Sequence, residues 1–357
     1  MSSSPPTHRL PQRGPAVRGG ILALTAAVLF GISTPLVQKF GSGVGAFTTA
    51  ALLYAGAAVV GALLRRRVEH EARVVSADVP RLLAMAAVGA VVGPVALAWG
   101  LQRTSGTSAS LMLTLEALFT AVLAWWLYRE AMGRRVWAAM LLLLAGGSLL
   151  VLDQGRDGGA RLWGLLAVLV ATAAWGLDNA LSRALAERDP GQVVLAKAFL
   201  GAAATSMLAV GFAEALPSPG AALGLFAVGA TGYGLSLRFY LLAQRAFGAA
   251  RTGSVFAFAP FIGAALAVAM GDQSTSAVMA AGSMLMLAGV VLHLAESHGH
   301  EHEHEAIEHE HAHRHDDGHH EHVHEPMPAG AHSHRHRHAP RWHAHPHVPD
   351  AHHAHRH

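Results

Sequence analysis

Long apolar segments alternate with short polar segments over residues 19–296. Segments such as ILALTAAVLFGISTPLV and AAMLLLLAGGSLLVL contain no charged residue. About 20 apolar residues, at ~1.5 Å rise per residue, cross the ~30 Å hydrocarbon layer of a membrane. Lipid offers no partner to an unpaired backbone group, and no alternating strand pattern occurs here, so each segment is expected to be a helix. The pattern therefore predicts an all-α integral membrane protein.

Turn-forming stretches divide this apolar region into separate spans. They include GSG at 41–43, QRTSG at 102–106 and LPSPG at 216–220. Ten transmembrane helices are expected, at about 19–39, 44–64, 82–102, 107–128, 136–153, 162–185, 192–214, 221–245, 251–271 and 275–296. An even number of spans places both termini on the same side of the membrane.

The distribution of Lys and Arg predicts which side that is. The N-terminus and alternate loops carry fifteen Lys and Arg residues, and the opposite set of loops carries four. Short cytoplasmic loops are enriched in these residues. Both termini are therefore expected in the cytoplasm, in a multi-pass protein of the cell membrane, which would be the inner membrane in a bacterium. Residues 1–18, polar and rich in proline, are interpreted as a disordered cytoplasmic lead.

The two halves of the apolar region resemble each other. Phe30-Gly31 matches Trp175-Gly176, and LQR at 101–103 matches AQR at 243–245. Five spans per half is an odd number, so the second half would be inserted upside down relative to the first. Inverted repeats are typical of secondary transporters. We expect two inverted five-helix repeats, at 19–156 and 157–297, followed by a tail at 298–357.

Two longer stretches resemble a known family. The first half closes on LTLEALFTAVLAWWLYREAMGRRVWAAMLLLLAGGSLLVL, and the second half contains LLAQRAFGAARTGSVFAFAPFIGAALAVAMGD, with its ART and APFIGA segments. Over residues 19–296 the chain resembles the EamA-type branch of the drug/metabolite transporter superfamily. This resemblance implies the ten-helix fold and solute export by a family with chemically diverse solutes. Glu116 departs from the family pattern, which more often has proline or an apolar residue at this position.

Glu116 is the first candidate for a functional site. It lies about ten residues from either end of the fourth predicted span, which is too deep for its short side chain to reach head groups. A charge at the bilayer centre costs from ~3 to more than ~10 kcal/mol, so an intramembrane ionisable group suggests a site. A carboxyl group that binds a proton in one conformation and a substrate in the other could support antiport. The alternative is a neutral structural glutamic acid that hydrogen-bonds between helices.

Further polar and aromatic residues lie within the predicted spans. Asp178 and Asn179 are in the sixth span, and Arg238 is in the eighth. Asp178 is expected to pair with Arg238 or with Lys197, whereas Lys197 is expected to extend to the head groups. Aromatic candidates for a substrate pathway are Trp99, Trp175 and Tyr233, with packing between helices or anchoring at the interface as the alternative.

Composition narrows the chemistry. The chain has 52% hydrophobic residues, 14% charged residues and no cysteine, and its formal net charge is +3. Without cysteine, disulfides and thiolate metal sites are excluded. The arginines lie mostly in short loops, so the positive charge does not indicate nucleic-acid binding. We expect no enzymatic activity and no required cofactor. The expected partners are the bilayer and a small solute, and the sequence leaves a homodimer and bound divalent ions open.

The tail has a different composition. Residues 298–357 hold 23 of the 26 histidines, interleaved first with Glu and then with Arg. Such a segment is expected to be disordered. Imidazole and carboxylate suit Zn²⁺, Ni²⁺, Co²⁺ and Cu²⁺. Because a spacing of two gives no single face on a helix, we expect many weak sites and no fixed one. The candidate ligands are His298, His300, His302, His304, His309, His311, His313, His315, His319, His320, His322 and His324.

The sequence favours a secondary-active exporter of a small organic metabolite or drug, which works by alternating access and could be coupled to protons through Glu116. One alternative is a protein of divalent-metal efflux or metal sensing, in which the tail receives the ion. A tail that responds to pH is another reading of the histidines, which titrate near ~6.5. A membrane scaffold that moves no solute is a further alternative.

Overall fold

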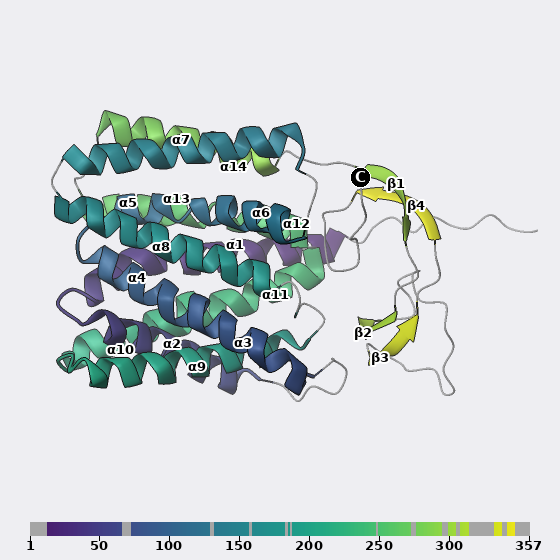
Figure 1. Ribbon diagram of the computed structural model, residues 1–357, viewed down its shortest axis with the longest axis horizontal. Coiled ribbons are helices and arrows are strands. Elements are labelled where there is room, and N and C mark those ends of the chain that lie inside the picture. The colour runs from purple at the N-terminus through teal and green to yellow at the C-terminus, as the bar shows by residue number, and fades with distance from the viewer. Residues whose placement is uncertain are drawn as a thin grey trace, which may run out of the picture.

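The computed structural model describes most of the apolar region and four short pieces of the tail (Figure 1). The described residues are 13–65, 73–128, 132–156, 159–182, 185, 188–247, 249–272, 276–294, 299–304, 308–313, 332–337 and 341–346. Most of the expected N-terminal lead, residues 1–12, lies outside them.

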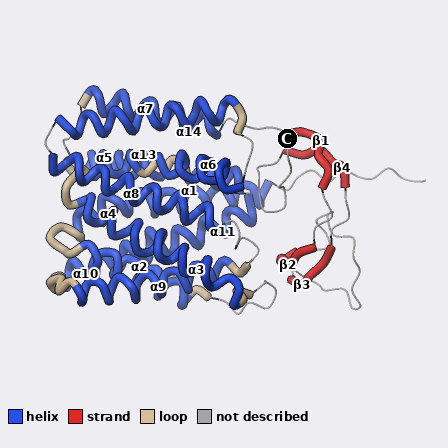
Figure 2. The backbone as a smooth tube through the Cα atoms, viewed as in Figure 1, coloured by secondary structure: helices blue, strands red, loops and turns tan. Residues whose placement is uncertain are grey.

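The described part of the chain contains ten helices that are long and apolar enough to cross a membrane. They lie side by side in one bundle (Figure 2). They are Val17–Phe40, Ala46–Leu63, Ser76–Leu101, Gly106–Leu127, Arg134–Gly155, Gly159–Ser182, Gly191–Gly211, Pro219–Ala243, Thr252–Ala269 and Ala277–Leu294. The prediction of ten spans is confirmed.

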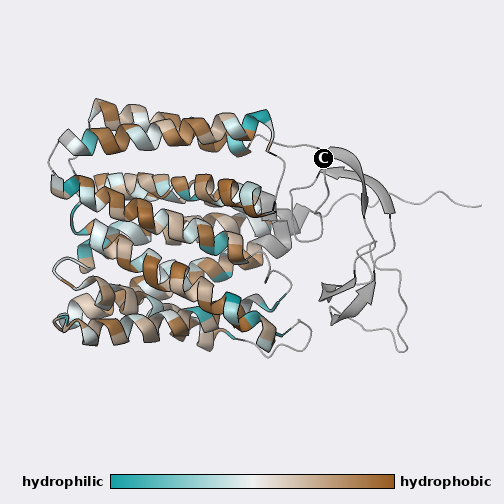
Figure 3. Ribbon diagram, viewed as in Figure 1, coloured by the Kyte–Doolittle hydropathy of each residue, from teal (hydrophilic) through white to brown (hydrophobic). Residues whose placement is uncertain are grey.

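Six of these spans are single α-helices. They are α1 (Arg13–Phe40), α2 (Ala46–Leu63), α7 (Arg134–Arg156), α8 (Gly159–Ser182), α9 (Pro190–Gly211) and α14 (Ala277–Leu294). Hydrophobic residues predominate along the helices of the bundle, as Figure 3 shows by colour, and many large ones are exposed. Leu141, Met207 and Met284 are each more than 60% exposed. An apolar outer surface of this extent is suited to lipid.

The third and eighth spans each contain a π-helical segment of seven residues. The third span runs through η1 (Ser76–Asp78), α3 (Val79–Met85), η2 (Ala86–Val92) and α4 (Gly93–Leu101). The eighth runs through α10 (Pro219–Val228), η4 (Gly229–Leu235) and α11 (Ser236–Phe247). Both π segments are rich in small residues, AAVGAVV and GATGYGL. Wider π turns often mark functional sites in helices.

The fourth and ninth spans are each broken by a short turn. The fourth consists of α5 (Gly106–Met112) and α6 (Leu115–Tyr128), and the ninth of α12 (Ala249–Phe256) and α13 (Ala259–Ala269). In the ninth, Pro260 stands in the first turn of α13, where its missing N–H is tolerated. The interruptions therefore occur in the same order in both halves of the chain.

Close helix contacts depend on glycine. Gly146 of α7 faces the backbone of Gly282 in α14, and Gly201 of α9 faces Ala90 of η2. Small residues allow helices to approach closely in a membrane. Two further contacts between helices position the candidate site: α6 packs against α8, and α13 packs against α1.

The structure describes four short pieces of the tail, which the sequence predicts to be disordered. Four strands of six residues occur there: β1 (Gly299–His304), β2 (Glu308–His313), β3 (His332–Arg337) and β4 (Arg341–Pro346). β1 pairs with β4, and β2 pairs with β3, both antiparallel (Figure 2). A histidine at every second position gives no face on a helix but one face on a strand. The expectation of disorder is therefore not confirmed for these residues.

Candidate functional site

Glu116 of α6 and Asn179 of α8 form a hydrogen bond between two helices. The amide Nδ2 of Asn179 donates to Oε1 of Glu116 at 2.7 Å and lies 3.5 Å from the hydroxyl of Thr120. Glu116 is the second residue of α6, directly after the break, and Asn179 is in the last turn of α8. Asn179 is exposed, and Glu116 is partly exposed. This polar contact between two helices is therefore accessible from outside the packed core.

Asp178 forms an ion pair with Lys197 of α9. Asp178 is 6% exposed, and its second oxygen, Oδ1, is buried without a hydrogen-bond partner among the described residues. Of the two expected cations, Lys197 is therefore the partner of Asp178. The expectation that Lys197 extends to the head groups is wrong in this structure. A carboxylate at this depth requires such a cation, because an unpaired buried charge is costly.

The backbone of Gly89 joins the ion pair to the aromatic residues. Its carbonyl oxygen in η2 accepts hydrogen bonds from the hydroxyl of Tyr54 at 2.7 Å and from Nε1 of Trp175 at 2.9 Å. A side chain at this position would collide with the carboxylate of Asp178. Glycine is therefore needed here for α8 to approach η2.

Aromatic rings continue from this point through the centre of the bundle. Phe30 of α1 contacts Trp175 at 6.5 Å, Tyr233 of η4 at 6.1 Å and Phe256 of α12 at 5.3 Å between ring centroids. Tyr54 in turn contacts Tyr233 at 5.8 Å. We call Glu116, Asn179, Asp178, Lys197 and these five aromatic residues the central cluster. Edge-on and tilted contacts of this kind are the usual geometry of packed rings.

Two predicted site residues lie apart from the central cluster. Nη1 of Arg238 donates to the carbonyl oxygen of Leu64 at 3.0 Å, at the C-terminal end of α2. Trp99 of α4 lies beneath the guanidinium of Arg103, 3.7 Å from its ring centroid, and is 38% exposed. Arg238 therefore satisfies a helix C-terminus, and Trp99 contacts Arg103 of the loop between α4 and α5.

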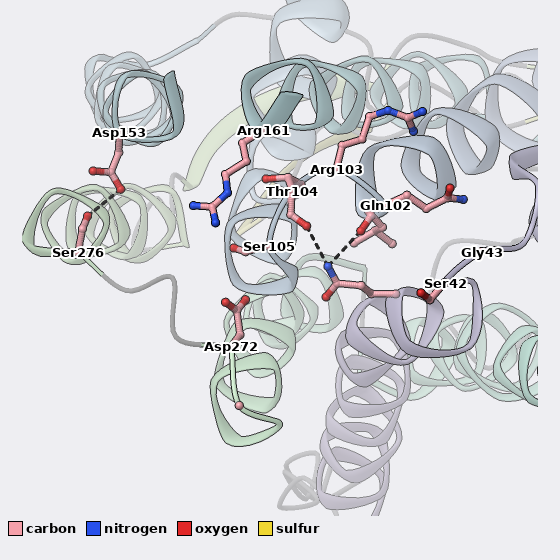
Figure 4. A pocket seen from close by; sticks show the side chains of 13 residues that line it. Ser42, Gly43, Gln102, Arg103, Thr104, Ser105, Asp153, Arg161, Asp272 and Ser276 are labelled. Carbon is pink, nitrogen blue, oxygen red and sulfur yellow. Dashed lines mark hydrogen bonds between the residues drawn. The ribbon is translucent and has the colours of Figure 1, made fainter. Parts of the chain in front are cut away.

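A cavity of about 880 Å³ (Figure 4) opens at the end of the bundle where α1 ends, because Gln38 in the last turn of α1 lines it. It is lined mostly by polar loop residues between spans. Arg161 approaches from α8, and Asp272 lies across from it after α13 (Figure 4). Nε2 of Gln38 donates to the carbonyl oxygens of Leu101 at 3.0 Å and Thr104 at 2.9 Å. These bonds connect α1 to the turn after α4 at the wall of the cavity.

Two carboxylates bind helix N-termini at this same end. Glu214 accepts from the backbone N–H groups of Phe47 at 3.1 Å and Thr48 at 2.7 Å, and from the hydroxyl of Thr48 at 2.7 Å. Asp272 accepts from the backbone N–H of Thr107 at 2.9 Å and from its hydroxyl at 2.8 Å. Glu214 thus satisfies two free N–H groups in the first turn of α2, and Asp272 satisfies one in the first turn of α5.

The structure describes only some of the predicted metal ligands. Of these histidines, His298, His315, His319, His320, His322 and His324 lie outside the described residues. The others are on β1 and β2: His300, His302, His304, His309, His311 and His313. Within the helical part of the chain that the structure describes, no group of three or more His, Asp or Glu is arranged to hold a metal ion.

Comparison with known proteins now decides the family. The sequence profile of the EamA-like transporter family matches residues 17–152 and again residues 162–295. The chain belongs to the EamA-like transporter family. Each half of this EamA-like transporter thus matches the family once, and the resemblance seen in the sequence is confirmed. Because members of this family are membrane transporters, the protein is a multi-pass transporter and not an enzyme.

Two further proteins are similar to this EamA-like transporter. A protein from Methanothermobacter thermautotrophicus, described as an uncharacterized transporter, is 27% identical over 306 residues, or 79% of this chain and 88% of that protein. A crystal structure matches with a TM-score of 0.56 and 20% identity, and covers 77% of this chain and 94% of that one. At that identity, the crystal structure supports the fold alone.

Sequence reasoning missed several residues of this EamA-like transporter. Gln38, Asp153, Arg161 and Ser276 line the cavity, where Ser276 donates to Oδ2 of Asp153 at 2.7 Å. All four lie in or beside turns, where polar residues are common in any membrane protein. Tyr54 carries a clearer signal, because a hydroxyl in the middle of an apolar span needs a partner.

Proposed function

We propose that this protein is a secondary-active exporter of a small organic solute and that the central cluster is its substrate site. The observation that carries the proposal is the hydrogen bond between Glu116 and Asn179. It joins α6, which follows a break, to α8 of the other half of the chain. Intramembrane ionisable groups that face the bundle interior typically mark substrate or proton pathways.

The proposed transport cycle is alternating access between two inverted five-helix repeats. Three observations support it: the two family matches, the odd number of spans in each half, and the repeated order of π segments and broken helices. In transporters of this construction, the substrate site lies where the repeats meet. The central cluster meets this condition, because its residues come from both halves of the chain.

The proposed orientation follows from charge. With Lys and Arg enriched at the end where α1 begins, both termini lie in the cytoplasm. The cavity lined by Gln38 and Asp272 then opens on the other side of the membrane. We assign it as the outer vestibule, through which an exported solute leaves.

The chemistry of the central cluster suits a small solute with both apolar and polar groups. The rings of Phe30, Trp175 and Tyr233 offer flat apolar surfaces, and Glu116 offers a group that binds a proton or a hydrogen-bond donor. We propose that solute and proton compete for Glu116, which couples export to proton entry. Transport of a metal ion gains no support from the described helices or from the comparisons.

The test begins with the released solutes. Cells that overproduce the wild-type protein, Glu116→Gln or Thr34→Val are compared by untargeted mass spectrometry of the medium. Thr34 is the matched control, because it stands in the first half where Asn179 stands in the second. At equal amounts of membrane protein, wild type and Thr34→Val are expected to enrich the same solutes. Glu116→Gln is expected to enrich them about tenfold less.

A second measurement isolates the coupling role. Purified protein in liposomes is given the solute found in the medium, with and without a pH gradient. The gradient is expected to accelerate the wild type and to have no effect on Glu116→Gln. If wild type enriches no solute, the exporter proposal is wrong. If the gradient drives Glu116→Gln as fast as wild type, only the coupling role of Glu116 is wrong.

A further inference from the structure

The two parts of the third span are held in different ways. In α4, a Cβ on Gly93 would come within 2.6 Å of Nε1 of Trp175. A Cβ on Gly100 would come equally close, 2.6 Å, to the carbonyl oxygen of Gly164. Both partners belong to α8, and small residues let membrane helices approach this closely. The part of the span that ends at Leu101, beside the cavity, is therefore fixed to α8.

The other part of the span, α3, makes a small apolar contact of its own. Leu82 and Met85 of α3 are 7% and 2% exposed and pack with Leu185, which is 3% exposed, in a cluster separate from the main core. Leu181, in the last turn of α8, packs against this cluster. It follows Asp178 by three residues and so lies on the same face of α8. The cluster therefore lies next to Asp178, on the side away from the cavity.

Two polar contacts hold the start of α3. Nε of Arg188 lies 2.8 Å from Oδ2 of Asp78, the residue before α3. The backbone N–H of Val74 donates to Oε1 of Gln192, in the first turn of α9, at 3.1 Å. We call these two contacts the α3 latch. The side chain of Arg188 is 23% exposed, and an ion pair that water reaches contributes little to stability. Opening the latch therefore costs less than separating α4 from α8.

The π segment η2 separates the fixed part of the span from the latched part. It begins directly after α3 and ends directly before Gly93-Pro94. Proline removes a hydrogen bond from the helix, and π turns often mark functional places in helices. The middle of η2 is itself held, because the carbonyl oxygen of Gly89 accepts from Tyr54 and Trp175. η2 is thus a fixed point about which α3 can turn while α4 stays in place.

We propose that α3 is the cytoplasmic gate of this transporter. It turns about η2, breaks the α3 latch and opens a path from the cytoplasm to Asp178 and the central cluster. The proposal rests on the proposed export function and supplies the entry that this function requires. At the opposite end of the bundle the cavity is open while the latch is closed. Alternating access requires one end to be open and the other closed, so this structure represents the outward-facing state.

The accessibility of an introduced cysteine tests the gate without any transported solute. The chain has no cysteine of its own, so Leu82→Cys supplies a single reporter thiol. The matched control is Leu225→Cys, because Leu225 is also buried and precedes Gly232 of η4 by as many residues as Leu82 precedes Gly89. The full-length protein in detergent is labelled with a maleimide. Arg188→Gln is expected to accelerate labelling of Leu82→Cys about fivefold and to leave that of Leu225→Cys unchanged.

A conservative variant separates the latch from a general loss of structure. Arg188→Lys keeps the positive charge and is expected to label Leu82→Cys within about twofold of the rate with Arg188. Acceleration of both reporters by Arg188→Gln would show that Arg188 supports the fold as a whole. That result, no acceleration at Leu82→Cys, or equal acceleration by Arg188→Lys and Arg188→Gln would each overturn the gate.

A covalent lock tests the part of the gate in transport. Leu82→Cys with Leu185→Cys is joined in cells by a short, membrane-permeant bis-thiosulfonate, and the medium is compared by untargeted mass spectrometry. Enrichment of the exported solutes is expected to fall about tenfold and to recover after reduction. The control is Phe47→Cys with Phe212→Cys, whose native rings stack at 5.1 Å between α2 and the end of α9. Joining this control pair is expected to leave export unchanged.

The two measurements distinguish failure of the gate from failure of the export function. If the joined Leu82→Cys and Leu185→Cys pair exports as well as the unjoined pair, or if the control pair stops export equally, α3 is not the gate. If wild type enriches no solute, the export function is wrong, and the labelling rates still decide whether α3 opens when the latch is broken.

Discussion

Two helix contacts of similar construction differ in their chemistry. In one, Gly176 of α8 packs against Phe119 and Thr120 of α6, and in the other Gly31 of α1 packs against Ala259 and Ile262 of α13. The first contact contains the hydrogen bond between Glu116 and Asn179. In the second, Pro260 and Thr34 stand at the corresponding places of their helices. The two halves thus share the same helix packing, and of these two contacts only the one between α6 and α8 contains a carboxyl group.

The buried ion pair shows the same asymmetry. Asp178 follows Trp175-Gly176 at the distance at which Ser33 follows Phe30-Gly31. Lys197 precedes Gly201 at the distance at which Leu52 precedes Gly56. The first half therefore has a hydroxyl and an apolar side chain where the second half has two charges. The two repeats share the arrangement of their helices, and the charged groups of the site lie at positions where the second repeat differs from the first.

The largest effect is expected from removing the cation of the ion pair. Lys197→Met leaves Asp178 as a buried, unpaired charge and should lower the free energy of unfolding by about 3–5 kcal/mol. Leu52→Met, at the corresponding place, should cost less than about 1.5 kcal/mol, because it nearly conserves volume and polarity. Thermal unfolding in detergent measures both. The double variant Asp178→Asn with Lys197→Met should regain part of the loss.

A result that contradicts this prediction would be informative. If Lys197→Met is no more destabilising than Leu52→Met, the pair does not hold Asp178 in its charged form. The asymmetry between the halves would then lie in Glu116 and Asn179 alone.

The matched π segments allow a finer comparison. Gly89 and Gly232 are each the fourth residue of their segment, but Gly89 faces the carboxylate of Asp178, and Gly232 faces Cβ of Ser33. Alanine at either place overpacks the contact and should cost about 1–3 kcal/mol. Combined with Lys197→Met, only Gly89→Ala should be non-additive, by about 0.5 kcal/mol or more, because only Gly89 contacts the pair. Additivity at both positions would contradict the contact between Gly89 and the pair.

Much of the fold follows from the sequence. Ten spans, most of them with ends within a few residues, could be read from apolar length and turn-forming stretches. Glu116, Asp178 and Asn179 could be found because polar groups in apolar helices need an explanation. Their residue type and their depth in the predicted span can be seen in the sequence.

Which side chains form hydrogen bonds or ion pairs with each other could not be predicted from the sequence. Lys197 and Arg238 lie at similar depths, and only the packing of α8 against its neighbours decides that Lys197 meets Asp178 while Arg238 reaches Leu64. The cavity lined by Gln38 and Asp272 depends on how segments from distant parts of the chain converge. In the tail, histidine at every second position can be seen in the sequence. This spacing was compared only with a helix, although it also fits a strand.

The smallest effects are expected where the two halves agree. The hydroxyls of Thr48 and Thr107 each donate to a carboxylate that caps their own helix, Glu214 and Asp272 respectively. Thr48→Val and Thr107→Val should each cost about 1 kcal/mol, since one hydrogen bond to a charged acceptor is lost and the backbone bonds remain. Thr25→Val, which removes a hydroxyl bond within α1 only, is the control and should cost less. Unfolding in detergent gives the three values. Glu214 and Asp272 cap their helices in the same way at the same end of the bundle. The costs of Thr48→Val and Thr107→Val should therefore agree within about 0.5 kcal/mol. A clear difference between them would mean that the asymmetry of the central cluster extends to the end of the bundle where these caps lie, and the two halves would then share less than their helices suggest.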